Sequence, residues 1–179
     1  MITGRARLFG DNINTDYIIS SRRKRDSLDP AVLRQFLFED VDPRFAATLV
    51  PGDLIVAGKN FGCGSAMEIA ASVLVGNGMK AVLARSFART YFRNAVNNGL
   101  VPVACDTREI HEGDQVAVDF PIAAIDELPT QCEITVRNES TGKMLPAEPI
   151  SKLLVAILRA GGLAPFFKQH GGFGADPDL

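Results

Sequence analysis

Residues 58–65 (GKNFGCGS) form a glycine-rich segment that ends in a serine, and this is the first pattern in the chain that can do chemistry. Glycines let a backbone turn sharply and approach a ligand closely. A helix is expected directly after Ser65, and helix N-termini offer unpaired N–H groups and a positive dipole end to an anion. There the serine hydroxyl can contact a bound carboxylate, or act as a base once it is deprotonated. The segment therefore predicts a carboxylate site around Ser65.

The same serine also has a purely structural interpretation. Ser65 and Glu68 have the spacing of a capping box, in which two side chains satisfy backbone N–H groups at the start of a helix. A capping serine lies at the positive end of its helix, so the two interpretations are compatible. Nucleotide motifs fit poorly, because no Gly-Lys-Ser/Thr follows the first glycine at the P-loop distance and the Gly-x-Gly at 62–64 lacks the third glycine of a dinucleotide site.

A second polar cluster lies near the N-terminus. An apolar trio at 17–19 follows five polar residues, namely Asp11, Asn12, Asn14, Thr15 and Asp16. Four consecutive cations come next, namely Arg22, Arg23, Lys24 and Arg25. Such a run can clamp a polycarboxylate, since arginine binds a carboxylate through two parallel hydrogen bonds. The alternative is a solvated loop, because Asp26 and Asp29 partly neutralise it.

Three further arginines, Arg85, Arg89 and Arg93, recur every four residues around an expected helix. This spacing places them along one helix face. They are either solvated or bridge to a partner.

The cysteines and histidines are too scattered to form a metal site within this chain. Cys63, Cys105 and Cys132 lie far apart, and neither His111 nor His170 has a Cys or His nearby. Zinc and cluster loops need closer spacings. An odd number of scattered cysteines fits a reducing compartment, and Cys63 is expected to pack as a small residue.

Composition describes an ordinary globular chain of 179 residues, with 46% hydrophobic and 22% charged residues. The net charge of 19 − 21 = −2 argues against a nucleic-acid surface. The N-terminus lacks a secretory signal, and the longest apolar run, 70–75, is too short to span a bilayer. We expect one cytoplasmic domain over 1–170 with a flexible tail at 171–179, and neither a nucleic-acid nor a membrane partner.

Strand and helix patterns alternate through the middle of the chain. The expected buried strands are 53–58, 80–85 and 100–104, and the helices between them are 66–78 and 86–97, the second capped by Ser86. This order predicts an α/β fold with a parallel core.

The flanking segments add to this core. An earlier helix is expected from Pro30, with Asp29 as its N-cap. Residues 114–120 and 132–138 favour additional antiparallel strands, and a last helix is expected over 151–159.

Three segments together resemble the small subunits of the 3-isopropylmalate dehydratases, in which the swivelling domain of the aconitase family is a separate chain. They are FGDNINTDYII at 9–19, PGDLIVAGKNFGCGS at 51–65 and AVLARSFARTYFRNAVNNGLVPV at 81–103. ILRAGGLAPFFK at 157–168 is similar to the family's C-terminal end. The resemblance implies a single swivelling β/β/α domain of the aconitase C-terminal type.

The resemblance also implies a partner and a reaction. In this family a separate large subunit carries a [4Fe-4S] cluster, and the small subunit closes over it. The pair removes water from a hydroxylated di- or tricarboxylic acid and adds it back. This chain is itself expected to bind no metal.

By resemblance, Ser65 is the catalytic serine, an alkoxide that takes the proton from the carbon next to the one losing hydroxyl. An alkoxide of this kind needs stabilisation by the helix dipole and nearby cations. Asp16 is expected near the catalytic centre, and the loop at 20–27 matches the segment that senses the variable arm of the substrate. The expected substrate-binding residues are Thr15, Arg22, Arg23, Arg25 and Gly64.

One departure from the family pattern bears on the substrate. The family reads G-S-S-R-E-H after the glycines, whereas residues 64–69 read G-S-A-M-E-I. Met67 replaces an arginine that ordinarily helps bind a substrate carboxylate, a loss of about 2–5 kcal/mol if nothing compensates. Either residues 22–25 supply the charge or the substrate differs. The alternatives to isopropylmalate are homoaconitate, citrate-like acids, maleate-type diacids, and a non-catalytic carboxylate-binding module.

Overall fold

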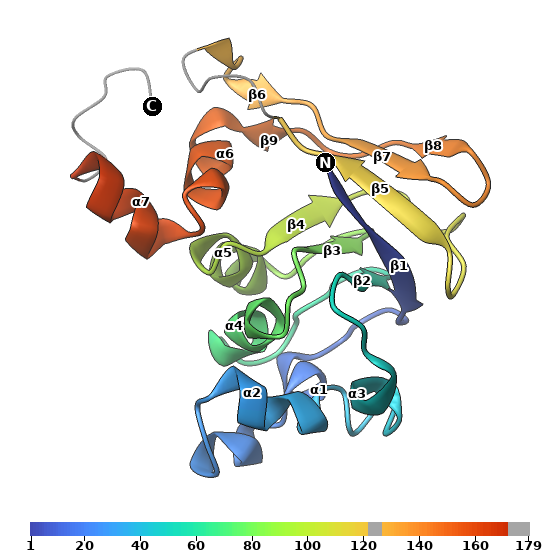
Figure 1. Cartoon of the computed structure of the whole chain (residues 1–179), viewed down its shortest axis with the longest axis vertical. Coiled ribbons are helices and arrows are strands. Elements are labelled where there is room, and N and C mark those ends of the chain that lie inside the picture. The colour runs from blue at the N-terminus through green and yellow to red at the C-terminus, as the bar shows by residue number, and fades with distance from the viewer. Residues whose placement is uncertain (122–126, 172–179) are drawn as a thin grey trace.

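The computed structural model describes residues 1–121 and 127–171 as a twisted sheet with helices packed against it (Figure 1). The strands are β1 (Ile2–Leu8), β2 (Leu54–Ala57), β3 (Ala81–Ala84), β4 (Val101–Ala104), β5 (Gln115–Asp119), β6 (Gln131–Cys132), β7 (Thr135–Asn138), β8 (Lys143–Leu145) and β9 (Ile150–Ser151). The α-helices are α1 (Thr15–Ile18), α2 (Pro30–Leu33), α3 (Phe45–Thr48), α4 (Ile69–Gly76), α5 (Arg89–Asn97), α6 (Lys152–Arg159) and α7 (Leu163–His170), with 3-10 helices η1 (Ser21–Arg25) and η2 (Arg34–Phe36). The expected tail lies outside the described residues, apart from Gly171.

The main sheet has the strand order β4-β3-β2-β1-β5-β7-β8. Strands β4, β3, β2 and β1 are parallel neighbours, whereas β5, β7 and β8 continue the sheet antiparallel. The predicted parallel core with added antiparallel strands is therefore confirmed. The central strand β1 was not expected from the sequence.

Both faces of β2, β3 and β4 are buried, which is why these strands read as continuous apolar runs. Leu54 and Val56 of β2 face one core, shared with α6 and α7, whereas Ile55 and Ala57 face a second core beneath α4. Helices α1 to α3 cover the second core at the lower end of the molecule (Figure 1). None of the helices within the described ranges is long and apolar enough to cross a membrane.

Helix α5 begins later than the sequence suggested. Its N-cap is Ala88, which forms no side-chain cap. Ser86, the expected cap, instead accepts a hydrogen bond at Oγ from the Asn60 N–H at 2.8 Å. The capping prediction is wrong because a partner distant in sequence takes the serine oxygen.

The helix at 151–159 is confirmed as α6, with Ser151 as its N-cap, but it is not the last helix. After Gly161 and Gly162 the chain reverses into α7, which buries Phe166 in the first core. Gly162 has φ +119°, and a Cβ there would collide with the Asn97 carbonyl at the end of α5. The glycines therefore permit a tight turn between two helices rather than ending the fold.

Asp29 caps α2 as predicted, since its side chain accepts from the Ala31 N–H and Pro30 is the first helical residue. Helix α2 ends at Leu33, and η2 follows directly at Arg34. Phe38, with φ +55°, then turns the chain into the second core.

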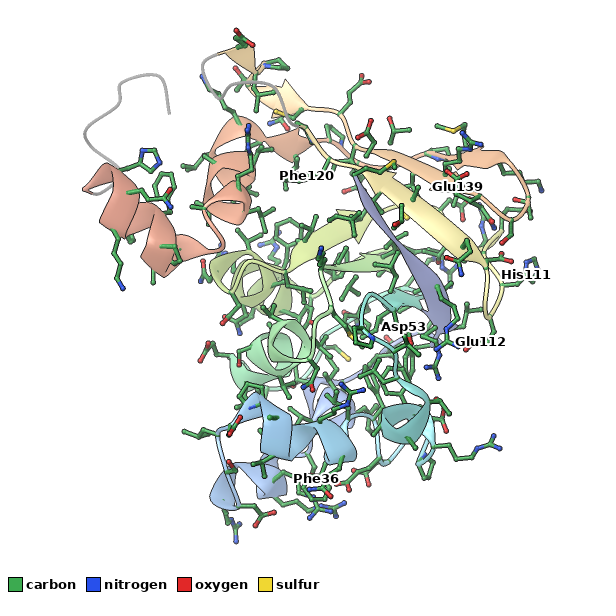
Figure 2. All side chains as sticks on the ribbon, in the orientation of Figure 1. Phe36, Asp53, His111, Glu112, Phe120 and Glu139 are labelled. Atoms are coloured by element: carbon green, nitrogen blue, oxygen red, sulfur yellow. The ribbon has the colours of Figure 1, made fainter. Side chains whose placement is uncertain are left out.

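A buried carboxylate, Asp53, ties β1 to the turn before β2. It accepts two hydrogen bonds from Arg5 at 3.0 and 2.8 Å, one from Arg7 at 3.3 Å and one from the Val50 N–H at 3.0 Å. Arg7 also binds Glu112 at 2.9 Å. Figure 2 shows Asp53 and Glu112 close to the same end of β1. Two arginines can therefore lie within a strand whose neighbours are apolar.

Candidate active site

The two polar segments found in the sequence meet where the parallel strands β1 and β2 end. Backbone hydrogen bonds join them: the Asn12 N–H donates to the Lys59 carbonyl, the Gly62 N–H to Ile13, and the Thr15 N–H to Cys63, at 2.7–2.8 Å. Ligands of parallel α/β sheets bind outside the carboxyl ends of the strands. The fold thus places both segments where such a site is expected.

Ser65 is exposed at this edge and is held by its backbone. Its carbonyl accepts hydrogen bonds from Thr15 Oγ1 at 2.9 Å and from the Met67 N–H at 2.8 Å. Its hydroxyl forms no hydrogen bond with any residue in 1–121 or 127–171. The Ser65 hydroxyl is thus free to contact a ligand, while two hydrogen bonds to its carbonyl hold the backbone in place.

The capping-box prediction for Ser65 is wrong. Helix α4 begins at Ile69, after Glu68, and no side chain caps it. The Thr15 hydroxyl and the turn at Gly64 hold the chain outside the helix for three more residues. Ser65 is therefore not the N-cap of α4, and three residues separate it from the first helical residue.

Gly64 is required by close packing. It has φ +91°, and a Cβ there would collide with the side-chain amide of Asn14. That amide oxygen in turn accepts from the Asp16 N–H at 2.9 Å, which makes Asn14 the N-cap of α1. The sequence pattern placed Asn14 in the polar cluster without indicating a role for it, although Asn before a short helix is a common capping signal.

Asp16 connects the backbone around Ser65 to residues 21–25, which we call the cationic loop. It lies half-buried in α1, and one carboxylate oxygen accepts from the Ser21 N–H at 2.9 Å, where η1 begins. Thr15 and Asp16 are adjacent residues with different partners. Thr15 donates a hydrogen bond to the Ser65 carbonyl, and Asp16 accepts one from the loop at 21–25. The structure therefore joins three predicted site segments through a single turn of helix.

The arginines of the loop differ in their partners. Arg23 forms two hydrogen bonds to Glu39, at 3.0 and 2.8 Å, and its guanidinium lies 3.8 Å from the centre of the Phe36 ring. Arg22 binds Glu39 and Asp40 at 3.2 and 3.1 Å.

These pairings anchor the loop to the segment after η2. The hydrogen bonds from Arg23, and then those from Arg22, hold the pKa of Glu39 below its usual range. Arg25 is exposed and forms no ion pair with any residue that the structure describes. Arg25 is therefore the arginine of this loop that remains available to a ligand.

Another ion pair stabilises the start of residues 58–65, which we call the serine loop. Asp11 accepts from the Lys59 N–H at 2.7 Å and from Arg85 at 2.5 Å. Those two hydrogen bonds lower the pKa of Asp11, the first more than the second. Asn12 and Asn60, both with positive φ, bond to each other through their side chains at 2.9 Å. The ion pair between Arg85 and Asp11 was not predicted from the sequence, because the two residues lie 74 positions apart.

The chain is similar in sequence to a known domain family and to several curated proteins. Residues 41–108 match the family described as Aconitase C-terminal domain. The 3-isopropylmalate dehydratase small subunit of Nautilia profundicola is 42% identical, with 94% of this chain and 95% of that one covered. The methanogen homoaconitase small subunit of Methanocaldococcus jannaschii is 40% identical, with 95% and 93% covered.

A solved structure agrees with these matches. The crystal structure of 3-isopropylmalate dehydratase (leuD) from Methanocaldococcus jannaschii has a TM-score of 0.82 and 38% identity over 95% of each chain. This chain belongs to the 3-isopropylmalate dehydratase small-subunit family. The family and the fold class expected from the sequence are thus both confirmed.

Within this small-subunit family fold, residue 67 is apolar and buried. The Met67 side chain is 3% exposed and packs in the core beneath α4. The exposed residues beside it, Ser65, Ala66 and Glu68, supply no cation. A carboxylate bound at Ser65 must therefore find its cation on another segment or another chain.

The described residues also offer no set of ligands for a metal cluster. No group of three or more His, Cys, Asp or Glu side chains among them is arranged to hold a metal ion. Burial, and then the nearby Asp106 charge, raises the pKa of the Cys105 thiol to about 12, so this cysteine is a poor thiolate ligand. An iron-sulfur cluster does not fit these residues.

Proposed function

We propose that this chain is the small subunit of a two-subunit hydro-lyase of the 3-isopropylmalate dehydratase type, which dehydrates a hydroxylated polycarboxylic acid and rehydrates it. The names of its relatives describe small subunits, which supports a larger partner chain. The iron-sulfur cluster expected from the family would belong to that partner. The cytoplasmic location and the single domain over 1–170 stay predictions.

One observation carries this proposal: the hydroxyl of Ser65 is exposed and unbonded among the described residues, while its backbone is anchored by Thr15. In the proposed step, Ser65 as an alkoxide takes the proton from the carbon beside the hydroxylated one. The C–H electron pair forms the double bond. The hydroxyl leaves with the electron pair of the C–O bond and is taken up by an acid on the partner side. Asp16 holds the loop that meets the substrate.

The absence of a cation beside Ser65 has a consequence for this step. Residues 64–68 carry no cation that could stabilise the alkoxide, and Ser65 is not the N-cap of α4. We infer that the stabilising charge comes mainly from the large subunit, with Arg25 as an additional cation from this chain. The chain alone is therefore expected to be inactive.

The test is reconstitution with a cluster-bearing large subunit. We expect turnover by the pair, and a loss of at least about 10³-fold in kcat for Ser65→Ala, because the general base is removed. Ser72→Ala, a half-buried serine within α4, is the matched control and should keep wild-type activity. Retained turnover in Ser65→Ala would remove Ser65 as the base, and no complex with any large subunit would refute the assignment as a subunit.

A second candidate is the same chemistry on a more highly charged acid. Arg25 favours it, because this exposed arginine has no acidic partner among the described residues. A substrate panel of isopropylmalate, homoaconitate, a citrate-like acid and a maleate-type diacid discriminates between the two. Preference for isopropylmalate over all the more acidic compounds excludes this candidate, whereas binding without turnover by the reconstituted pair would support the non-catalytic module.

A further inference from the structure

Two adjoining cavities open at the carboxyl ends of β3 and β4, beside the serine loop. Their volumes are about 480 and 440 Å³, and both are lined by Ala104 and Glu148. The first extends to Lys59 and Arg108, and the second runs along α5 to Phe87 and Phe92. Together they form one continuous open groove, which we call the arginine groove.

The arginine groove carries an excess of positive charge. Its lining includes five cations, namely Lys59, Arg85, Arg89, Arg93 and Arg108, and two acids, Asp106 and Glu148. Arg108 is paired with Asp106, and Arg85 with Asp11 just outside the groove. Counting Asp11, five cations face three acids, so two positive charges remain in a chain whose net charge is −2.

Arg89 and Arg93 are the cations that local structure does not explain. They are exposed, they lie at positions i and i+4 of α5, and neither forms an ion pair with the residues that the structure describes. Like charges at this spacing repel each other. Arg89 also stands at the first position of α5, where the helix dipole disfavours a cation.

Two features therefore make this arrangement unfavourable for the isolated chain. An acidic partner would reverse both, because it would screen the repulsion and complement the positive end of the helix. The groove walls also include apolar surface from Phe87, Phe92 and Pro146. This mixture of apolar contact and charge suits a polypeptide segment better than a small anion alone.

The groove is continuous with the candidate active site. Lys59 lines the groove, and its carbonyl accepts from Asn12 at the base of the serine loop. Phe87 faces Phe61 of that loop, with their ring centres 6.1 Å apart. A chain that covers Ser65 to complete the active site would therefore cover the groove as well.

We propose that the arginine groove binds an acidic segment of the large subunit, with Arg89 and Arg93 as its main contacts. This inference rests on the proposed function, since it requires a large-subunit partner. It adds a docking surface, outside the serine loop, that aligns the two chains.

The test compares binding of the full-length chain to the large subunit for the wild type, Arg89→Gln/Arg93→Gln and Arg89→Glu/Arg93→Glu. We expect the dissociation constant to rise about tenfold for the neutral pair and about 100-fold or more for the reversed pair, since charges at an interface set affinity and association rate. The wild-type affinity should also fall with added salt, and the variants should show a weaker salt dependence. Arg44→Glu/Lys80→Glu, two exposed cations outside the groove, is the charge-matched control.

Thermal unfolding of the free chain separates docking from folding. The glutamine pair removes a like-charge repulsion, so its Tm should equal or exceed that of the wild type while its binding is weaker. Unchanged binding in both variants overturns the proposal, as does a raised substrate KM with unchanged subunit affinity, which would indicate a small-anion site. If the wild type binds no large subunit, the proposed function fails instead of the docking surface alone.

Discussion

The buried carboxylate Asp53 permits a sharp test of how this fold accommodates charge. Asp53→Asn keeps the shape of the side chain but removes the charge that Arg5 and Arg7 face. Breaking a buried ion pair from one side costs about 3–5 kcal/mol. Arg5 is 38% exposed and Arg7 keeps Glu112 as a partner, so solvent and that second carboxylate reduce the loss.

We therefore expect Asp53→Asn to lower the free energy of unfolding by about 2–3 kcal/mol at pH 7. For a chain of this length that corresponds to a fall in Tm of roughly 4–12 °C. Urea unfolding followed by circular dichroism measures the difference. Asp40→Asn is the control, since Asp40 is 44% exposed and pairs with an exposed arginine, so its loss should stay below about 0.5 kcal/mol.

The pH dependence gives an independent check. Burial raises the pKa of Asp53, but the hydrogen bonds from Arg5 and the Val50 N–H outweigh it, so the pKa in the folded chain lies below 3.8. A lowered pKa means that the carboxylate contributes its full stability above the unfolded value and loses it as the pH falls through the folded value. The deficit of Asp53→Asn should therefore be largest above about pH 5 and shrink in acid. A loss below 1 kcal/mol at pH 7, or one that does not shrink in acid, would refute this account of β1.

Substitutions at two further positions test the packing around the site. Tyr91 is buried, and its hydroxyl has no hydrogen-bond partner within residues 1–121 and 127–171. Tyr91→Phe should therefore leave Tm unchanged or raise it, whereas Tyr91→Ala should cost about 3–5 kcal/mol of stability. A clear loss of stability in Tyr91→Phe would reveal a partner for the hydroxyl. Glu39→Gln removes the shared partner of Arg22 and Arg23, so amide hydrogen exchange at 21–25 should accelerate while global stability falls by less than about 1 kcal/mol. Unchanged exchange there would show that Glu39 does not anchor the loop.

Strands β2, β3 and β4 were predictable because their signal is local. Each is a short apolar run between turn residues, and burial on both faces makes such runs continuous. Strand β1 was missed because Arg5 and Arg7 interrupt its apolar pattern. Those arginines are compatible with a central strand only because Asp53, nearly fifty residues away, neutralises them.

In the serine loop, by contrast, a local pattern predicted a structure that does not form. The local S-x-x-E pattern predicted a helix cap at Ser65, and local energetics alone would favour it. The Thr15 hydroxyl takes the Ser65 carbonyl, and Gly64 packs against Asn14, so α4 begins only at Ile69. Contacts across fifty residues override a capping preference worth about 1 kcal/mol.

The sequence by itself determined the family, the parallel core and the segments of the candidate site, because these depend on residue types and on short spacings. Only the tertiary structure decided which charges remain available. It neutralises Arg22 and Arg23 with acids from the segment after η2 and leaves Arg25, Arg89 and Arg93 without acidic partners among the described residues. The physical reason is that an ion pair depends on distance in space, and folding brings together side chains whose separation along the chain gives no sign of their contact.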